Sequence, residues 1–330
     1  DGINWTQGTM PSSQNYLYIC YGNGVFVTVT ASYSLYYSID GINWTQGTIN
    51  HDINMTVFYG AGKFITITSN TPSNQFSYCT LPTSYYQFSG WNPSTDFIIN
   101  ENKTISGTWS KKNKLKVSYS WSNQPSGMKS KVPSDEYYHY GDNVMVDTTY
   151  NNKSGYKEEK IKVTEGTMPS SQEWYDIAYG NGKYVAITGN SSSNVFAYST
   201  DGINWTQGTF PSSQNWSSVC YGNGKYVAIT YNSNIFAYST NGTSWTQGTM
   251  PISQDWYSVC YGNGKFVAVA YASNVFAYSS NGTSWTQGTM PSVQNWEWIC
   301  YGNGKYVAVG YNSNVFAYST DGINWTQGTF

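Results

Sequence analysis

Arginine is absent from the 330 residues, and all 16 basic side chains are lysines. Charged residues make up only 10% of the chain, and the formal net charge is −2. A chain with so little positive charge lacks the electrostatic field that binds nucleic-acid phosphates. The sequence also has no apolar run long enough to span a bilayer as a helix. We therefore expect neither nucleic-acid binding nor membrane insertion.

Residues that bind metals or phosphates are scarce as well. The two histidines, His51 and His139, lie far apart in the sequence, and no cysteine or histidine pair has the spacing of a zinc site. The glycine-rich phrase Tyr-Gly-Asn-Gly-Lys is not followed by a helical pattern, so it does not predict a phosphate-binding loop. We expect no metal, no cofactor and no catalytic residues.

Aromatic residues and internal repeats, by contrast, are abundant. Aromatics reach 18% of the chain, with 32 Tyr and 14 Trp. Residues 201–240 recur almost unchanged at 241–280 and 281–320, and less similar copies begin at residues 1, 40 and about 165. The phrase Tyr-Gly-Asn-Gly, or Tyr-Gly-Ala-Gly in one case, marks six copies in total. A period near 40 residues is typical of propeller blades or solenoids.

Within one copy the hydrophobic period is that of a β-strand. Four short runs, 204–209, 215–221, 225–230 and 234–239, are separated by turn residues. Asn-Gly and Asp-Gly pairs favour the positive φ angles of primed hairpin turns. Four antiparallel strands repeated six times predict an all-β fold, a six-bladed β-propeller of about 40-residue blades, because closing a ring protects blade edges.

The turn phrase Ser199-Thr-Asp201-Gly202-Ile-Asn-Trp205 resembles the Asp-box of sialidase-like (BNR) propeller repeats, as found in phage tail-fibre and bacterial surface proteins. It recurs in register at 38–44, 239–245, 279–285 and 319–325, and the resemblance covers about three quarters of the chain. The spacing is one residue shorter than the commoner family pattern, and Asn replaces Asp in two copies. The resemblance implies that Ser and Asp bond the turn between the third and fourth strands and that Trp packs between blades.

The family's enzymes allow a direct test of sialidase activity. Sialidases bind their substrate carboxylate with an arginine cluster, which this chain lacks, so that activity is excluded. Other glycosidases need two carboxylates facing one pocket. The acids outside the repeated phrases belong to different copies, apart from the pair Glu173 and Asp176. We therefore expect that the protein is not an enzyme.

One segment interrupts the repeats. We place the propeller at 1–80 and 157–330 and a small β-rich inserted domain at 81–156. Phrases within the insert, at 88–91, 103–109, 116–121 and 140–144, resemble the two halves of a Listeria–Bacteroides (β-grasp-like) repeat in inverted order. After the insert, Lys160–Thr167 is expected to supply the missing fourth strand of the second blade. Ile3–Thr9 and Ile323–Thr329 are equivalent, so one outer strand is surplus at a terminus.

Four of the five cysteines share one repeat position, at the end of the first strand of a blade. In the other two copies this position holds Phe58 and Ala178. A position that accepts cysteine, alanine and phenylalanine is typical of packing. The same position on successive blades is unsuited to disulfide geometry, and we interpret these residues as structural free thiols.

Copies that agree elsewhere differ in two short patches. The first is the start of the first strand, and the second is the turn between the second and third strands. Both are expected on one face of the ring, and their Tyr, Trp, Ser and Asn content is typical of recognition surfaces. The predicted ligand-binding residues are Gln214, Asn215, Trp216, Tyr231, Gln254, Trp256, Tyr257, Tyr271, Gln294, Trp296, Trp298 and Tyr311. The alternative is drift in a duplicated gene, with these rings filling gaps between blades.

These observations favour non-catalytic recognition at a cell or virion surface, by an adhesin, a receptor-binding module or a lectin-like module. The expected partner is a cell-surface glycan or protein receptor, and similar blades would offer several weak sites. The expected location is extracellular, at the surface of a cell or a virion. The alternative is a structural spacer or decoration subunit of a larger oligomeric assembly. Exposure of the Trp216 ring would favour recognition, and burial between blades would favour structure.

Overall fold

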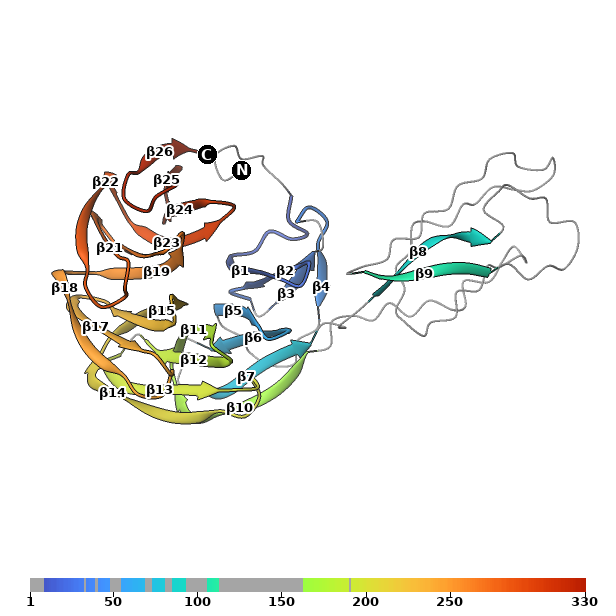
Figure 1. Cartoon of the computed structure of the whole chain (residues 1–330), viewed down its shortest axis with the longest axis horizontal. Helices are drawn as coiled ribbons and strands as arrows, with labels where there is room; N and C mark the ends of the chain where they lie inside the picture. The colour runs from blue at the N-terminus through green and yellow to red at the C-terminus, as the bar shows by residue number, and fades with distance from the viewer. Residues whose placement is uncertain are drawn as a thin grey trace, which may run out of the picture. The chain divides into compact units, whose positions relative to one another are not determined.

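The computed structural model describes residues 9–32, 34–38, 41–47, 55–68, 73–80, 85–92, 106–112, 163–189 and 191–330. The chain divides into two compact units, one formed by Asp1–Thr80 with Lys162–Phe330 and the other by Leu81–Ile161. The first unit is an all-β six-bladed propeller, as the repeat pattern predicts (Figure 1). The first strand of each blade lies nearest the centre of the ring and the fourth lies at its outer edge (Figure 1).

Each blade is a four-stranded antiparallel sheet. Blade 1 contains β1 (Tyr16–Gly22), β2 (Val25–Thr30), β3 (Leu35–Ser38) and β4 (Thr45–Gly47). Blade 2 contains β5 (Met55–Gly60), β6 (Lys63–Thr68), β7 (Ser73–Thr80) and β10 (Thr164–Gln172), and blade 3 contains β11 (Trp174–Gly180), β12 (Lys183–Thr188), β13 (Ser193–Ser199) and β14 (Thr206–Gln214). Blade 4 contains β15 (Trp216–Gly222), β16 (Lys225–Thr230), β17 (Ser233–Ser239) and β18 (Thr246–Gln254). Blade 5 contains β19 (Trp256–Gly262), β20 (Lys265–Ala270), β21 (Ser273–Ser279) and β22 (Thr286–Gln294), and blade 6 contains β23 (Trp296–Gly302), β24 (Lys305–Gly310), β25 (Val315–Ser319) and β26 (Thr326–Thr329).

Blade 2 is completed across the insertion. Its outer strand β10 follows the second unit in sequence and pairs with β7, with Thr164 opposite Tyr78. A fourth strand after the insert is therefore confirmed, although it starts at Thr164 rather than at Lys160. The insertion replaces the turn between the third and fourth strands, a position where a blade tolerates extra chain because both ends are at the surface.

Two kinds of turn join the strands. In the hairpin between the first and second strands of blade 4, Asn223 and Gly224 have φ angles of 44° and 74°, the left-handed pair of a primed turn. In the turn after the third strand of blade 3, only Gly202 is left-handed, with φ 72°. There the Gly202 N–H donates to Ser199 Oγ at 2.9 Å, and the Asn204 N–H donates to Asp201 Oδ1 at 2.8 Å. Side-chain oxygens therefore hold this turn, and the prediction of a primed turn at Asp201-Gly202 was wrong.

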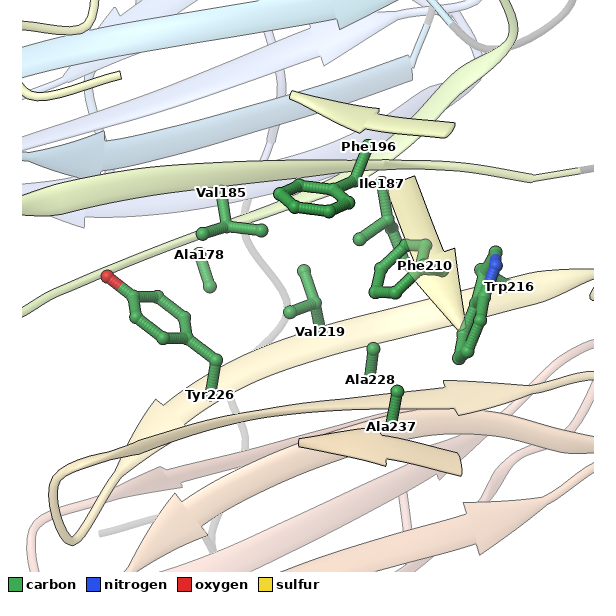
Figure 2. Packing of buried hydrophobic residues seen from close by; sticks show 10 residues of the cluster. All are labelled: Ala178, Val185, Ile187, Phe196, Phe210, Trp216, Val219, Tyr226, Ala228 and Ala237. Atoms are coloured by element: carbon green, nitrogen blue, oxygen red, sulfur yellow. The ribbon is translucent and has the colours of Figure 1, made fainter. Parts of the chain in front are cut away.

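The hydrophobic core lies between the sheets. In the cluster between blades 3 and 4, the ring of Trp216 stacks on Phe210 with centroids 4.1 Å apart (Figure 2). The ring of Trp245, from the turn after the third strand of blade 4, packs against Phe196 of blade 3 and Tyr226 of its own blade. The distances between ring centroids are 5.7 and 6.2 Å. Large aromatic rings thus fill the wedge between neighbouring blades, and burying them supplies most of the packing energy.

The contact between blades 6 and 1, which we call the seam, differs from the other junctions. At those junctions a tyrosine of the first strand covers a glycine of the preceding blade, as Tyr261 covers Gly222. At the seam, no atom lies within 4 Å of the position that a Cβ atom would occupy on Gly302, and the side chain of Tyr21 is 59% exposed. The inner strands still meet where Tyr18 lies edge-on to Trp298, with centroids 4.6 Å apart. The C-terminal repeat phrase supplies the fourth strand of blade 6, and residues 3–8 of the competing phrase lie outside the described residues.

The second unit contains one described hairpin, β8 (Tyr85–Asn92) paired with β9 (Ser106–Lys112). The phrases at 116–121 and 140–144, on which half of the Listeria–Bacteroides resemblance depends, lie outside the described residues, as do His51 and His139. Among the residues that the structure describes, no helix has the length and apolar character needed to cross a membrane.

Candidate functional site

In the five blades where the structure describes both variable patches, blades 1 and 3 to 6, the two patches meet at one end of the strands. In blade 4 the Tyr231 N–H donates to the carbonyl of Asn215 at 2.8 Å, and in blade 5 the Tyr271 N–H donates to that of Asp255 at 2.9 Å. These bonds tie the turn after the second strand to the residue that precedes the first strand. Substitutions in either patch therefore alter the same local surface.

A cavity of about 340 Å³ lies where the patches of four blades converge. Eight residues line it: one belongs to blade 3, four to blade 4, two to blade 5 and one to blade 6. These are Tyr175, Asn215, Trp216, Ser217, Tyr231, Tyr257, Tyr271 and Glu297. We call this cavity the tyrosine pocket.

The tyrosine pocket contains five of the twelve residues predicted from the sequence, namely Asn215, Trp216, Tyr231, Tyr257 and Tyr271. The other seven do not line it: Gln214, Gln254, Gln294, Trp256, Trp296, Trp298 and Tyr311.

The expectation of exposed indole rings was wrong, and the burial of Trp216 between blades is the outcome named above as favouring the structural alternative. Trp216 is 1% exposed, and Trp256 and Trp296 are fully buried. The ladder between the first two strands of blade 4 shifts register between Trp216 and Ser218, and such a bulge re-aims the side chains next to it. The Trp216 Nε1–H donates to the carbonyl of Ser193 in blade 3 at 2.9 Å, so this ring joins two blades.

The remaining predicted residues have other partners. Trp298 packs against Tyr18 at the seam. Gln294, the last residue of β22 in blade 5, accepts a hydrogen bond from Ser313 of blade 6 at 3.0 Å. Gln214 and Gln254 end the outer strands β14 and β18, opposite serines of the third strands. Tyr311 is 54% exposed but lies outside the tyrosine pocket.

Three pocket residues were missing from the prediction: Tyr175, Ser217 and Glu297. All three occupy the second position of a first strand, one of the most variable positions of the repeat. The Tyr175 hydroxyl donates to that of Tyr257 at 3.2 Å, which links blade 3 to blade 5 across the pocket. Variability between copies could have identified this position, because the neighbouring Trp is nearly constant.

The charges around the tyrosine pocket are negative. Partial burial raises the pKa of Glu297 above its ordinary value. Burial, followed by the charge of the hydrogen-bonded Asp255, raises the pKa of Tyr231. The described lysines of the propeller, in contrast, begin the second strands at the other end of the blades: Lys63, Lys183, Lys225, Lys265 and Lys305.

A second carboxyl lies on the inner strand of blade 3. The Val219 N–H and the Ser218 hydroxyl donate to Asp176 Oδ2 at 2.8 and 2.9 Å, which ties blade 3 to blade 4. In blade 5 the same strand position holds Ser258, whose hydroxyl accepts from the Ile299 N–H of blade 6 at 3.3 Å. Burial raises the pKa of Asp176 to about 6, although these hydrogen-bond donors, with the Ile177 N–H, counteract it.

We expect Asp176→Ser to flatten the pH dependence of stability. The folded-state pKa is above the ordinary value of 3.8, so ionisation opposes folding and stability falls as the pH rises from about 4 to above 6. A shift of two units corresponds to about 3 kcal/mol, and we expect about 1–2 kcal/mol because the side chain keeps some contact with solvent. Serine is chosen because its hydroxyl can accept a hydrogen bond from the next blade, as Ser258 accepts from the Ile299 N–H.

Urea unfolding of both proteins at pH 4 and pH 7 tests this expectation. The variant should lose less stability than the parent protein between the two values. An identical loss in both proteins would show that Asp176 is not the group responsible.

The cysteines lie apart from this chemistry. Burial raises the pKa of Cys20 to about 11 and that of Cys79 to about 12, and the pKa values of Cys220 and Cys260 are well above normal. Thiols with raised pKa values are poor nucleophiles at neutral pH. All five are free in the structure, and the described residues contain no group of three potential ligands placed to hold a metal ion.

Solved structures share the propeller fold of this chain. A virginiamycin B lyase from Staphylococcus aureus is similar over 97% of this chain and 86% of its own, with 11% identity and a TM-score of 0.65. YCF48 from Cyanidioschyzon merolae is similar over 98% and 87%, with 12% identity and a TM-score of 0.55, and YCF48 bound to D1 peptide over 96% and 82%, with 12% identity and a TM-score of 0.52. No protein-family model and no curated protein matches the chain. At such low identity these likenesses show the fold alone, and they include both an enzyme and a peptide-bound protein.

Proposed function

We propose that this protein is a non-catalytic recognition module that binds glycans in the tyrosine pocket. One observation carries the proposal: residues from the variable patches of blades 3 to 6 line one cavity. Drift on an ordinary surface would not concentrate tyrosine at the positions that meet there. Tyrosines combine a stiff ring with a polar tip, which suits them to recognition.

The chemistry of the lining fits a saccharide. Tyr257 and Tyr271 lie 5.8 Å apart with an interplanar angle of 31°, which gives neighbouring aromatic surfaces for sugar rings. Asn215 and Glu297 add an amide and a carboxyl that can bond hydroxyl groups. A cavity of about 340 Å³ is at the lower end of small-molecule sites, so the pocket would hold one or two sugar units of a longer chain.

The same lining argues against hydrolysis. Glycoside hydrolysis needs two carboxyl groups facing the scissile bond. Glu297 is the one acidic side chain among the lining residues of the pocket, and Asp255 is hydrogen-bonded to Tyr231. This supports binding without turnover.

A glycan array probed with the intact protein tests the proposal. We expect binding that the double variant Tyr231→Ala, Tyr257→Ala weakens at least tenfold, because each ring is worth about 1 kcal/mol or more. Tyr311→Ala is the matched control, since this tyrosine has the equivalent repeat position but lies outside the pocket. Undiminished binding by the double variant would place the ligand elsewhere and contradict the proposal.

We also infer that the Ser-x-Asp/Asn-Gly turns are Asp-boxes of the BNR type. The Asn241 and Asn281 turns repeat the bonds seen at Asp201, with the Gly242 and Gly282 N–H groups donating to serine at 2.8 and 2.9 Å. Their tryptophans pack between blades, as that family's do. Together with the low charge and the Asn, Ser and Tyr content, this supports a place at a cell, phage or other extracellular surface.

The buried Trp216 ring and the seam both favour a second candidate, a structural subunit of a larger assembly. Ile19, Tyr21 and Phe330 are 62%, 59% and 57% exposed at the seam, an unusual display of large apolar side chains. Light scattering across a concentration series tests this candidate. A concentration-dependent oligomer that Tyr21→Ser abolishes would support it, and a monomer throughout would contradict it.

A further inference from the structure

We propose that the tyrosine pocket selects ligands that carry an organic ammonium group, either the protonated amine of an amino sugar or a methylated ammonium. The inference rests on the proposed recognition function and specifies its ligand class. Two features of the pocket carry it: the arrangement of its tyrosine rings and the sign of the charges around them.

The rings form a connected aromatic surface. Tyr257 lies at its centre. The ring of Tyr231 is edge-on to that of Tyr257, with centroids 6.3 Å apart, and the centroid of Tyr271 lies 5.8 Å from that of Tyr257. Tyr175 joins the group through its hydroxyl, which bonds that of Tyr257 at 3.2 Å. The face of each ring carries a partial negative charge, which attracts cations within about 6 Å, and several rings together favour methylated or protonated amines.

The charged groups at the pocket add to this preference. Glu297 lines the pocket, and Asp255 lies beside Tyr231. Among the described residues that line the pocket, none has a positively charged side chain. Placing a half-buried carboxylate in a site without a cation is costly unless the ligand supplies the positive charge. An anionic ligand would meet repulsion from both acids.

The lysines of the described propeller are too distant to change this balance. Each begins a second strand of six residues, such as β16, whereas Tyr231 follows its end. A strand of that length spans roughly 20 Å, which exceeds the screening length of about 8 Å at physiological ionic strength. The acids at the pocket are therefore not neutralised by the lysines of the Asn-Gly-Lys hairpins.

Matched pairs of cationic and neutral ligands test the proposal by isothermal titration calorimetry of the intact protein. Choline is compared with 3,3-dimethylbutan-1-ol, which has the same shape without the charge. The tetramer of glucosamine is compared with that of N-acetylglucosamine. We expect the cationic member of at least one pair to bind about tenfold or more tightly than the neutral member. Preference within the first pair alone indicates a methylated ammonium, and within the second pair alone an amino sugar.

Two variants assign the effect to the pocket. Glu297→Gln, whose amide can still bond hydroxyl groups, should weaken binding of the preferred cation about fivefold or more and should weaken binding of its neutral partner by a smaller factor. Glu165→Gln, an exposed acid in the outer strand β10, should change neither affinity. Equal affinities within both pairs, an absence of measurable binding by all four ligands, or a cation preference that survives Glu297→Gln would each overturn the inference. Equal affinities that fall together in the double variant Tyr231→Ala, Tyr257→Ala would overturn ammonium selection while supporting the proposed recognition function.

Discussion

Trp216→Ala is expected to lower the free energy of unfolding by about 3–5 kcal/mol, the range for deleting a fully buried aromatic ring. The ring is 1% exposed, stacks on Phe210 and donates a hydrogen bond to the carbonyl of Ser193. Its removal leaves a cavity between blades 3 and 4 and an unsatisfied carbonyl. Urea denaturation followed by circular dichroism measures the loss.

Tyr311→Ala provides the control for this measurement. Its side chain is 54% exposed, and we expect its stability to remain within about 0.5 kcal/mol of the parent protein. If Trp216→Ala kept its denaturation midpoint and lost only ligand binding, the ring would be a recognition surface and the buried packing described above would be contradicted.

Gly222→Ala should be the second strongly destabilising change, by about 2–3 kcal/mol. An added Cβ would overlap the ring of Tyr261, which lies directly on this glycine. The tyrosine of blade 5 would have to move away from blade 4, and overpacking of this kind typically costs about 1–3 kcal/mol. Thermal unfolding should show a clear decrease in Tm.

Gly302→Ala is the matched variant at the same position of blade 6. No atom lies within 4 Å of the position that the added Cβ would occupy, so we expect the free energy of unfolding to change by less than about 0.5 kcal/mol. The two variants together test whether the seam is packed differently from the other junctions. Equal destabilisation would show that the ring of Tyr21 covers Gly302 in solution and that the seam is as tightly packed as the rest.

The architecture could be predicted because it depends on local signals that recur in register. The repeat period identifies the blades. The Asn-Gly pair at Asn223 favours a tight hairpin with left-handed residues, which pairs the first strand of the blade with the second. The turn at Asp201 was predicted less well. The dipeptide alone favours a primed turn, whereas the Asp-box resemblance implies a turn bonded by Ser and Asp, and the bonds to Ser199 and Asp201 agree with the second expectation.

The site was predicted in part for a similar reason. Variation between copies locates the end of the blades where the cavity lies, which is why the prediction included Tyr231 and Tyr257. It does not reveal which way a side chain points, because one bulge between Trp216 and Ser218 turns the indole into the interblade wedge. The pocket also spans blades 3 to 6, and no single repeat contains that information. Glu297 could be assigned to it only once the blades were placed around the ring.

Nuclear magnetic resonance of the protein with isotope-labelled tyrosine rings, titrated with the glycan that binds best on the array, tests the central claim most directly. Single Tyr→Phe variants assign the signals. We expect the ring signals of Tyr231, Tyr257 and Tyr271 to shift on binding, and those of Tyr311 and of Tyr198, near Lys183 at the other end of the strands, to remain in place. Shifts confined to Tyr311 or Tyr198, with the pocket rings unmoved, would contradict that claim.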